Sequence, residues 1–239
     1  MYKRQKRNTP KAVAVDGNAG MVYIIVDTVG KTPDHVIVTN TTSDTIVRDF
    51  ALPVIGDANG MTLKDGNLMV SIVLEDQCCG PRDSTVYALS TSTGAVVTNL
   101  FNANEDMTQG QVKGLASDGD SFIVAGERGR DLIVLDNAGV KIQSMFLFDP
   151  TDFNWFDQGY TGLTISATSS DLLTAKGNKI YNFDSDGRKK NSWTVTGATN
   201  IVGLAITGTT TDMESVYLVD SSTKTLRTAV IPTPETVIT

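Results

Sequence analysis

The chain has 239 residues, of which 40% are hydrophobic, and it carries a formal net charge of −7 with a pI near 4.7. This acidity disfavours binding to nucleic-acid phosphates or to an anionic membrane surface. No apolar run approaches the roughly 18 residues of a membrane span, so we expect neither a nucleic-acid partner nor membrane insertion. The acidic residues are 22 Asp and 5 Glu. Asp favours turns whereas Glu favours helix, which predicts many tight hairpins between strands.

The chain opens with basic residues that no apolar run follows, so this stretch does not have the pattern of a secretory signal. It resembles a translated sequencing adapter. We therefore expect residues 1–10 to be a non-native or disordered scar, and a missing signal then says nothing about compartment. The Pro- and Thr-rich residues 232–239 are expected to be a linker or the start of a missing strand.

Between these ends, residues 11–231 contain a unit of roughly 41 to 54 residues that occurs five times. Each unit opens with a small residue, an apolar residue and then Ala or Thr, and further apolar runs follow. The openings begin at Ala12, Gly60, Gly114, Gly162 and Gly203. Repeats of this period in an all-strand chain predict a β-propeller with one blade for each repeat.

The predicted strands follow in chain order. We expect the first blade at 12–15, 22–26, 36–38 and 46–52, and the second at 60–63, 68–74, 86–89 and 95–101. The third is expected at 114–116, 122–125, 132–135 and 141–148, and the fourth at 162–165, 172–174, 180–183 and 192–195. The segments 90–94, 136–139 and 184–187 open with Ser or Asp and close with Gly, which predicts tight turns. Gly114 and Gly162 open inner strands where backbones of neighbouring blades should approach closely.

The fifth repeat is incomplete. It supplies strands near 203–205, 216–220 and 226–231, and only 236–238 remain for a fourth after Pro232 and Pro234. The fold class is therefore an all-β propeller of about five four-stranded blades with the last one incomplete. We favour a fragment of a larger propeller with six or more blades, and the alternative is a five-bladed ring that closes imperfectly.

Three segments resemble known propeller families. Residues 114–139 resemble the NHL-repeat blade, and residues 162–188 and 203–231 are similar to the SdiA-regulated and phytase-like esterase propellers. This resemblance implies the architecture, because these families share blades and differ in ligands. Similarity to gluconolactonase-type propellers would imply a divalent metal held by Glu, Asn and Asp in the channel. Here Ala12, Val13 and Ala14 stand where the first acidic ligand is expected.

Two connections carry the candidate binding residues. The stretch 149–160 is rich in aromatic rings and carboxylates, which could stack a sugar or a cationic ligand or hold calcium. Its alternative, which we favour, is that the rings fill the gap between two blades while the Asp residues cap turns. The charged loop 127–131 could bind a carboxylate or phosphate through its Arg forks, unless it is simply a solvated hairpin. The candidate residues are Asp149, Asp152, Trp155, Asp157, Tyr160, Glu127, Arg128 and Arg130.

Adjacent Cys78 and Cys79 could form a vicinal disulfide, a feature that quinoprotein dehydrogenases place against their quinone. The repeated Trp motif of those propellers is missing, and a loop pair with no catalytic role is the favoured interpretation. Asp184 and Asp186 hint at a calcium loop, but the spacing of further ligands favours a turn. The single histidine, His35, is expected to be a solvated loop residue. No short catalytic or phosphate-binding motif occurs.

The leading hypothesis is a non-catalytic propeller module of an extracellular, surface or periplasmic protein that binds a protein or glycan through one face. It depends on the Thr- and Asp-rich composition, the acidic charge and the linker-like exit. The alternative is a calcium-dependent esterase or lactonase with its site in the central channel. No cofactor is required by the sequence, and calcium is the one ion left open.

Overall fold

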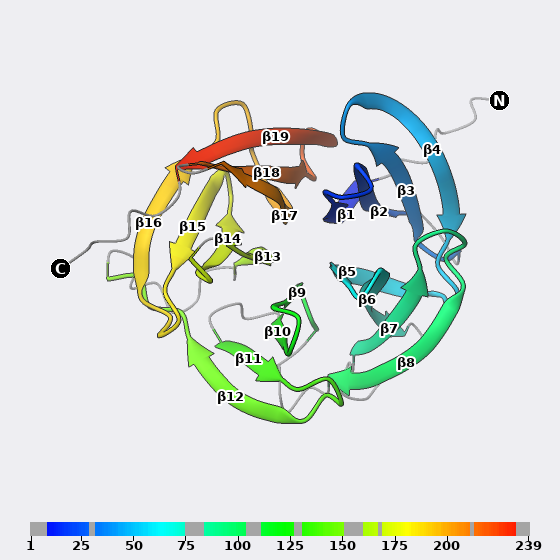
Figure 1. The fold of residues 1–239 in the computed structure, drawn as a ribbon, viewed down its shortest axis with the longest axis horizontal. Helices are drawn as coiled ribbons and strands as arrows, with labels where there is room; N and C mark the ends of the chain where they lie inside the picture. The colour runs from blue at the N-terminus through cyan, green and yellow to red at the C-terminus, as the bar shows by residue number, and fades with distance from the viewer. Residues whose placement is uncertain are drawn as a thin grey trace.

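The computed structural model describes residues 9–28, 32–74, 84–103, 111–126, 131–150, 160–166, 169–210 and 213–232. Within these ranges every regular element is a strand. The strands form five antiparallel sheets around a central axis (Figure 1). The predicted all-β propeller is therefore confirmed, with four strands in each of the first four sheets and three in the last.

Each sheet is one blade. Blade 1 contains β1 (Thr9–Asp16), β2 (Met21–Asp27), β3 (His35–Asn40) and β4 (Ser43–Ala51), and blade 2 contains β5 (Gly56–Lys64), β6 (Asn67–Leu74), β7 (Ser84–Ser90) and β8 (Val96–Ala103). Blade 3 contains β9 (Gly114–Ser117), β10 (Phe122–Ala125), β11 (Asp131–Leu135) and β12 (Lys141–Phe146). Blade 4 contains β13 (Thr161–Ile165), β14 (Leu172–Lys176), β15 (Lys179–Phe183) and β16 (Lys189–Thr194), and blade 5 contains β17 (Ile201–Thr210), β18 (Met213–Asp220) and β19 (Thr225–Pro232).

Many predicted strand bounds differ from the structure by a few residues, and two differences concern residues that we expected outside strands. β1 begins at Thr9, which pairs with Asp27, so the strand starts two residues before residue 11. His35 is the first residue of β3 rather than a loop residue, and its Nδ1 lies 2.7 Å from an Asp49 carboxylate oxygen. Both differences arise because pairing with a neighbouring strand extends an element beyond its apolar run.

Strand order within each blade follows chain order. β1, β5, β9, β13 and β17 surround the axis, and β4, β8, β12, β16 and β19 form the rim (Figure 1). The second strands are the most deeply buried, since blades pack against both faces of their sheets, and all four residues of β10 are buried. The outer strand β12 is mostly exposed. This gradient explains why the second strands are short apolar runs in the sequence and the outer strands alternate.

Blade 5 packs directly against blade 1. Val13 and Val22 of blade 1 share a buried cluster with Ala205 and Val219 of blade 5. The Tyr217 hydroxyl also donates to the Thr41 carbonyl at 3.3 Å. The five sheets therefore close into a ring, which is the alternative that the sequence left open rather than the larger ring that we favoured. Among the described residues β19 is the outermost strand of its blade, so the last blade is incomplete as predicted.

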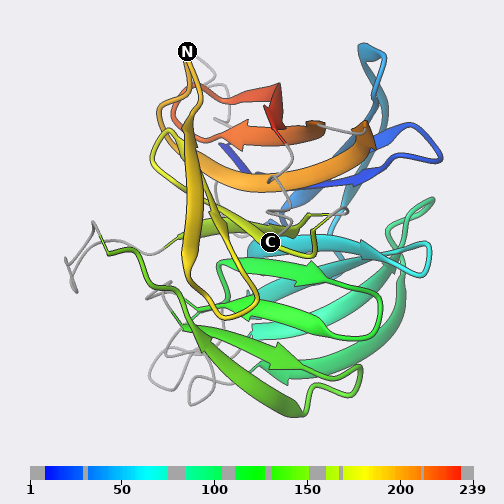
Figure 2. The same cartoon turned by 60° about the vertical axis from the view of Figure 1, so that its left-hand side comes forward.

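The ring has two faces. We call the side with the first-to-second and third-to-fourth strand connections the turn face, and the side with the second-to-third and blade-to-blade connections the loop face. In Figure 2 the turns of blades 1, 2 and 3 all project to the same side. Connections at the turn face include 17–20, 65–66, 118–121, 136–140 and 184–188.

The predicted turns are present at the turn face. Asp136 Oδ1 accepts the backbone N–H groups of Ala138 and Val140 at 2.9 and 2.8 Å, and Gly139 has a φ of 80°. Asp184 makes the same pair of bonds to the N–H groups of Asp186 and Arg188. A carboxylate that accepts local N–H groups, followed by a glycine at positive φ, is the arrangement that the sequence predicts. Asp184 thus belongs to a turn.

Candidate functional site

The five inner strands approach most closely at the residues that open the sequence repeats, and we call this ring of Ala12, Gly60, Gly114, Gly162 and Gly203 the collar. A Cβ on Gly114 would lie 3.0 Å from Leu163 Cβ. One on Gly162 would lie 2.8 Å from Gly203 Cα, and one on Gly203 would lie 2.9 Å from Ala12 Cα. The predicted close approach is therefore confirmed, and the last contact joins blade 5 to blade 1.

The collar nearly closes the central channel. The space at this level, which Asn59 and Val202 also line, is about 10 Å³. Such a volume holds at most about one water molecule. The collar therefore separates the channel into an end that opens at the turn face and an end at the loop face.

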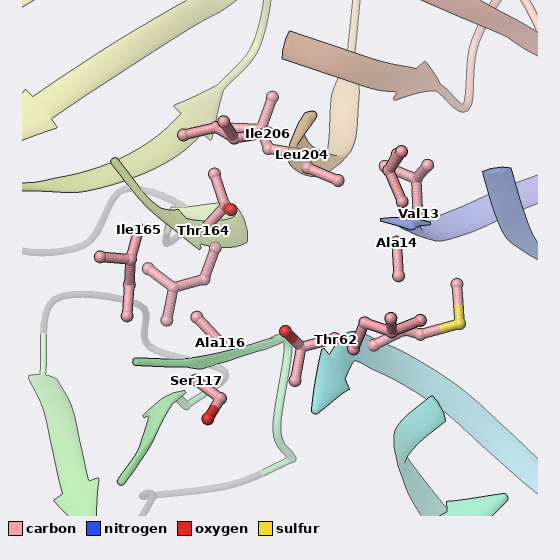
Figure 3. Close-up of a pocket in the computed structure, with 14 residues that line it drawn as sticks. Val13, Ala14, Thr62, Ala116, Ser117, Thr164, Ile165, Leu204 and Ile206 are labelled. Carbon is pink, nitrogen blue, oxygen red and sulfur yellow. The ribbon is translucent and has the colours of Figure 1, made fainter. Parts of the chain in front are cut away.

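On the turn-face side of the collar the channel widens into a cavity of about 180 Å³, to which all five inner strands contribute (Figure 3). Most lining residues are aliphatic, but polar atoms supply more of the surface that faces the cavity than apolar atoms do, and none of the lining side chains is ionisable. The lining residues are Val13, Ala14, Val15, Met61, Thr62, Leu63, Ala116, Ser117, Leu163, Thr164, Ile165, Leu204, Ala205 and Ile206. The lining side chains offer hydroxyl groups but no acid, base or thiol.

Three hydroxyl groups line this cavity, and two of them face it. Figure 3 shows the hydroxyl oxygens of Thr62 and Thr164 on the cavity side of their side chains, while that of Ser117 points away. Ser117 Oγ instead donates to the Ser121 carbonyl at 2.8 Å and so belongs to its own hairpin. Neither threonine hydroxyl has a hydrogen-bond partner among the described residues, so both can bond to a molecule in the cavity.

The loop-face side is charged. Lys11, on β1, points its Nζ at three carboxylates from blades 1 and 2. The Nζ lies 3.2 Å from Asp27 and 3.1 Å from Asp34, and it also bonds to Asp57. Asp34 is only 3% exposed, and it accepts the backbone N–H of Ala58 on β5 at 3.1 Å. We call these four residues the Lys11 network, and it ties blade 1 to blade 2.

Burial and pairing oppose one another in this network. Burial alone would lower the pKa of Lys11, but the hydrogen bonds and charges of Asp57 and Asp34 outweigh it and raise the pKa above its ordinary value. Burial raises the pKa of Asp34 even though Lys11 acts against it. Burial would also raise the pKa of Asp57, but the bonds from Lys11 and Asn59 hold it below its usual value. Lys11 therefore stays charged at neutral pH.

The Lys11 network also shows how well the loop face fits a divalent metal. Three carboxylates from different segments are a donor set of the kind that calcium binds. Here they converge on an ammonium, which supplies the positive charge at their centre. Among the described residues, no group of three or more His, Cys, Asp or Glu side chains is arranged to hold a metal ion. The described carboxylates thus fit a lysine-centred ion-pair network and not a calcium site.

Two predicted site residues lie within the described structure, and both are buried. Tyr160 packs edge-to-face against Tyr181 and Phe183 of β15, with ring centroids 5.3 Å away in each case. Asp149 is 5% exposed and lies 2.8 Å from Lys189 Nζ. These contacts join the blade 3 to blade 4 connection to blade 4. The rings that we expect to fill the gap between the blades lie outside the described residues, so that interpretation stays a prediction. A ligand role for the two residues stays a prediction.

The other predicted site residues lie outside the described residues, and their roles stay predictions. They are Cys78, Cys79, Glu127, Arg128, Arg130, Asp152, Trp155 and Asp157. Each belongs to a connection between strand ends at the loop face.

Sequence reasoning missed the Lys11 network. Its members are separated by up to 46 residues along the chain, so no local motif marks them. One signal was available, because Lys11 is a charged residue that directly precedes a predicted inner strand of small and apolar residues. A charge at such a position needs a partner, and the nearby acidic residues of the first blade were the candidates.

The comparisons with known proteins support the fold. No protein-family model and no curated protein matches the sequence. Among solved structures, the chain is similar to glutaminyl cyclase from Myxococcus xanthus, with a TM-score of 0.61 and 10% identity over 95% of this chain and 96% of that chain. It is also similar to a protein of unknown function from Bacteroides caccae, with a TM-score of 0.53 and 14% identity over 92% of this chain and 73% of that one. At these identities the similarity shows a shared propeller fold alone.

A third similar structure is a chain from the nidogen/laminin complex, with a TM-score of 0.52 and 14% identity over 82% of this chain and 67% of that chain. The glutaminyl cyclase and the chain from the nidogen/laminin complex are named for different roles, so the shared fold alone does not indicate one function. The described part of the chain includes no helix with the length and apolar character needed to cross a membrane.

Proposed function

We propose that this chain is a non-catalytic propeller module that binds a protein or glycan through its loop face, and that it works outside the cell, at its surface or in the periplasm. The observation that carries the proposal is the collar. The free space that the collar leaves in the channel has a volume of about 10 Å³. A partner at the loop face therefore meets a surface rather than a deep substrate pocket. Surface recognition by loops on a rigid scaffold is the usual way in which such folds bind macromolecules.

Two further observations support the loop face over the turn face. The longest connections, 75–83, 104–113 and 147–160, are blade-to-blade or second-to-third connections, and such connections carry the aromatic and charged residues that the sequence predicts as ligand contacts. Trp and Arg side chains of this kind are enriched among residues that dominate binding energy. The similar chain from the nidogen/laminin complex is an example of this fold in a protein complex. An acidic net charge favours a neutral or basic partner.

The enzyme alternative, a calcium-dependent esterase or lactonase, has less support. The described carboxylates of the loop face pair with Lys11, and the described walls of the turn-face cavity carry no ionisable side chain. A thermal-shift series in calcium separates the two proposals, since an ion that binds the folded state raises the melting temperature by mass action. We expect an unchanged melt at about 2 mM calcium. A rise of several degrees, abolished by Asp152→Asn or Asp157→Asn, would favour the calcium enzyme.

The binding proposal is tested on immobilised glycans and on a panel of purified extracellular-matrix and cell-surface proteins by surface plasmon resonance. We expect a binder whose affinity falls by roughly 10-fold or more in Trp155→Ala or in the double variant Arg128→Ala/Arg130→Ala. The matched controls are Lys141→Ala and Gln143→Ala on the exposed outer strand β12, which should bind as the wild type does. Equal losses in loop-face and β12 variants would contradict the assignment of the face.

A further inference from the structure

The outer edge of blade 5 differs from the outer edges of the other four blades. Blades 1 to 4 each end in a fourth strand, whereas β19 is the third strand of its blade and, among the described residues, no strand pairs with its outer side. Figure 1 shows β19 on the rim between β16 and blade 1. The backbone N–H and C=O groups along an unpaired edge are a template on which another strand can pair.

The pairing of β19 is not that of a protected edge. Proteins protect exposed edges with bulges, charges and prolines. The four outer strands have bulges, because the pairing of each with its third strand contains a register shift. β19 has no such shift, since eight consecutive residues pair with β18 in one unbroken register, as the other third strands pair with their second strands. β19 is therefore a regular third strand that carries no bulge at its open edge.

The side chains of β19 also favour pairing. Residues 228–231 are Thr, Ala, Val and Ile, an uncharged run in which β-branched residues predominate. Val230 is 60% exposed, and of the eight residues of β19 only Ile231 is buried. By contrast, five of the seven residues of β7, the third strand of blade 2, are buried. β19 is thus much less covered than the third strand of a four-stranded blade.

The other blades show what covers a third strand. Their outer strands are six to nine residues long, and each has an aromatic residue among its last three. At three junctions this aromatic residue lies so close to the third-to-fourth turn of the next blade that a Cβ on the glycine of that turn would overlap it. The pairs are Phe50 with Gly94, Phe101 with Gly139 and Phe146 with Gly187. By the same repeat, the last residues of a strand on β19 would lie at the β3–β4 turn of blade 1.

The charge of the chain narrows the source of such a strand. Each copy of the chain carries a net charge of −7, so two copies repel one another. An uncharged or basic segment of a different protein meets no such repulsion.

We propose that the open edge of β19 binds an extended segment of a partner protein. The segment is six to nine residues long, uncharged or basic and rich in β-branched residues, and it has an aromatic residue near its C-terminal end. It pairs antiparallel with β19 through main-chain hydrogen bonds and completes blade 5 as a fourth strand, with its aromatic residue at the β3–β4 turn. This site does not depend on the loop face, because it lies on the rim.

The probe is a synthetic peptide, capped at both ends, with the sequence of β8, because this outer strand is uncharged and has its aromatic residue third from its end. Binding is measured by fluorescence anisotropy and by hydrogen exchange of the β19 amides. We expect a dissociation constant of about 100 μM or below. Exchange should slow at alternate residues of β19, since successive N–H groups of a strand point to opposite sides.

Two control peptides test the mode of binding. A peptide with proline at its third and fifth positions lacks two main-chain donors and should not bind. A peptide with alanine in place of its phenylalanine should bind about 5-fold more weakly. Binding of either control as tight as that of the original peptide would overturn the proposal.

Proline variants of the protein locate the peptide. Of Ala229 and Val230, one N–H points to β18 and the other to the open edge, so one of Ala229→Pro and Val230→Pro keeps the pairing with β18. Circular dichroism identifies the variant that folds, and this variant should bind the peptide at least about 10-fold more weakly. The matched pair is Val96→Pro and Val97→Pro on β8, of which the folded variant should bind as the wild type does.

Undiminished binding in the folded β19 variant would place the peptide elsewhere and overturn the proposal. If neither β19 variant folds, hydrogen exchange of the wild type decides. Slower exchange confined to alternate residues of β19 supports the site, and slower exchange spread over other blades rejects it.

Other occupants of the edge would give different results. If a second copy occupies it, the wild type sediments as a dimer that excess peptide converts to a monomer. If residues 1–8 or 233–239 occupy it, the full chain does not bind the peptide but a chain trimmed to residues 9–232 does. Either result would overturn the proposal of a partner protein, as would a failure of both chains to bind the peptide.

Discussion

The two ends of the central channel are built from the same five inner strands, yet their chemistry differs. Toward the turn face the inner strands contribute residues such as Val15, Leu63 and Ile206 to a cavity whose lining side chains carry no charge. Toward the loop face Lys11 on β1 and Asp57 on β5 join a network of charges that links two blades. The collar separates the two. Each inner strand therefore contributes residues to both ends of the channel. The position of a residue along the channel axis decides whether its side chain contacts a neighbouring blade or the surface.

The difference also lies in how each end is encoded. Turn-face structure is local, since the carboxylate of Asp136 or Asp184 bonds to N–H groups no more than four residues away. The loop-face network joins Lys11 to Asp34 and Asp57, which lie 23 and 46 residues further along the chain. A turn held by local hydrogen bonds should form even when the chain changes elsewhere. A network of residues from distant segments forms only when the ring is closed.

The largest expected effect is at the collar itself. Gly162 and Gly177 have φ values of 60° and 61°, so alanine is strained equally at both. Only Gly162 is crowded, because a Cβ there would lie 2.8 Å from Gly203 Cα, whereas nothing lies within 4 Å of one on Gly177. We expect Gly177→Ala to cost about 1–2 kcal/mol of unfolding free energy, and Gly162→Ala about 1–3 kcal/mol more. Urea denaturation of both variants measures the difference.

Equal costs for these two variants would mean that blades 4 and 5 do not approach as closely as the ring requires. The same experiment then tests ring closure. Gly203 does not have a positive φ, but a Cβ there would lie 2.8 Å from Val219 Cγ2 and 2.9 Å from Ala12 Cα, so Gly203→Ala should cost about 1–3 kcal/mol through crowding alone if blade 5 meets blade 1. A near-neutral Gly203→Ala would contradict a closed ring of five.

At the loop-face end, Lys11→Met should destabilise the protein by about 2 kcal/mol. The substitution keeps the aliphatic stem and leaves the buried Asp34 carboxylate without its cation, and such unpaired buried charges are costly. The control is Lys141→Met, because Lys141 lies exposed on the outer strand β12 of another blade. We expect it to cost less than about 0.5 kcal/mol. Comparable losses in both variants would show that Asp34 does not depend on Lys11.

The sequence allowed much of the fold to be predicted and little of the site. Five repeats, their strands and the Asp–Gly turns follow from patterns a few residues long, and the structure confirms them. The size of the ring does not follow from such patterns. It depends on how closely Gly203 approaches Ala12, two residues 191 positions apart. The Lys11 network and the turn-face cavity were not predicted for the same reason, since each is formed by several blades only after the ring closes.

At the turn-face end, Asp184→Ala should cost about 1 kcal/mol, because the N–H groups of Asp186 and Arg188 lose their acceptor. Asp186→Ala is the matched control in the same turn, and it should change stability by less than about 0.5 kcal/mol because its exposed carboxylate accepts no bond there from the described residues. Thermal melts with and without calcium complete the test. A calcium-dependent loss in both variants would revive the calcium-loop interpretation of this turn.

The smallest effect is expected in the acid range, and it involves both faces. Burial alone would raise the pKa of Asp118 and of Asp220, but hydrogen bonds from neighbouring N–H groups outweigh it and hold both below the usual value. Carboxyls whose pKa is lowered on folding stabilise the protein above their unfolded pKa, near 4, and lose that stabilisation as pH falls through the folded value. Stability should therefore fall from about pH 4 toward pH 2. Asp34, whose pKa is raised, opposes this trend.

The two carboxyls should differ in their share of this effect. Asp220 at the loop face accepts three N–H groups, from Thr199, Ser222 and Thr223. Asp220→Asn should therefore flatten the acid limb of a urea-denaturation series more than Asp118→Asn at the turn face. The opposite order would place the acid sensitivity at the turn face.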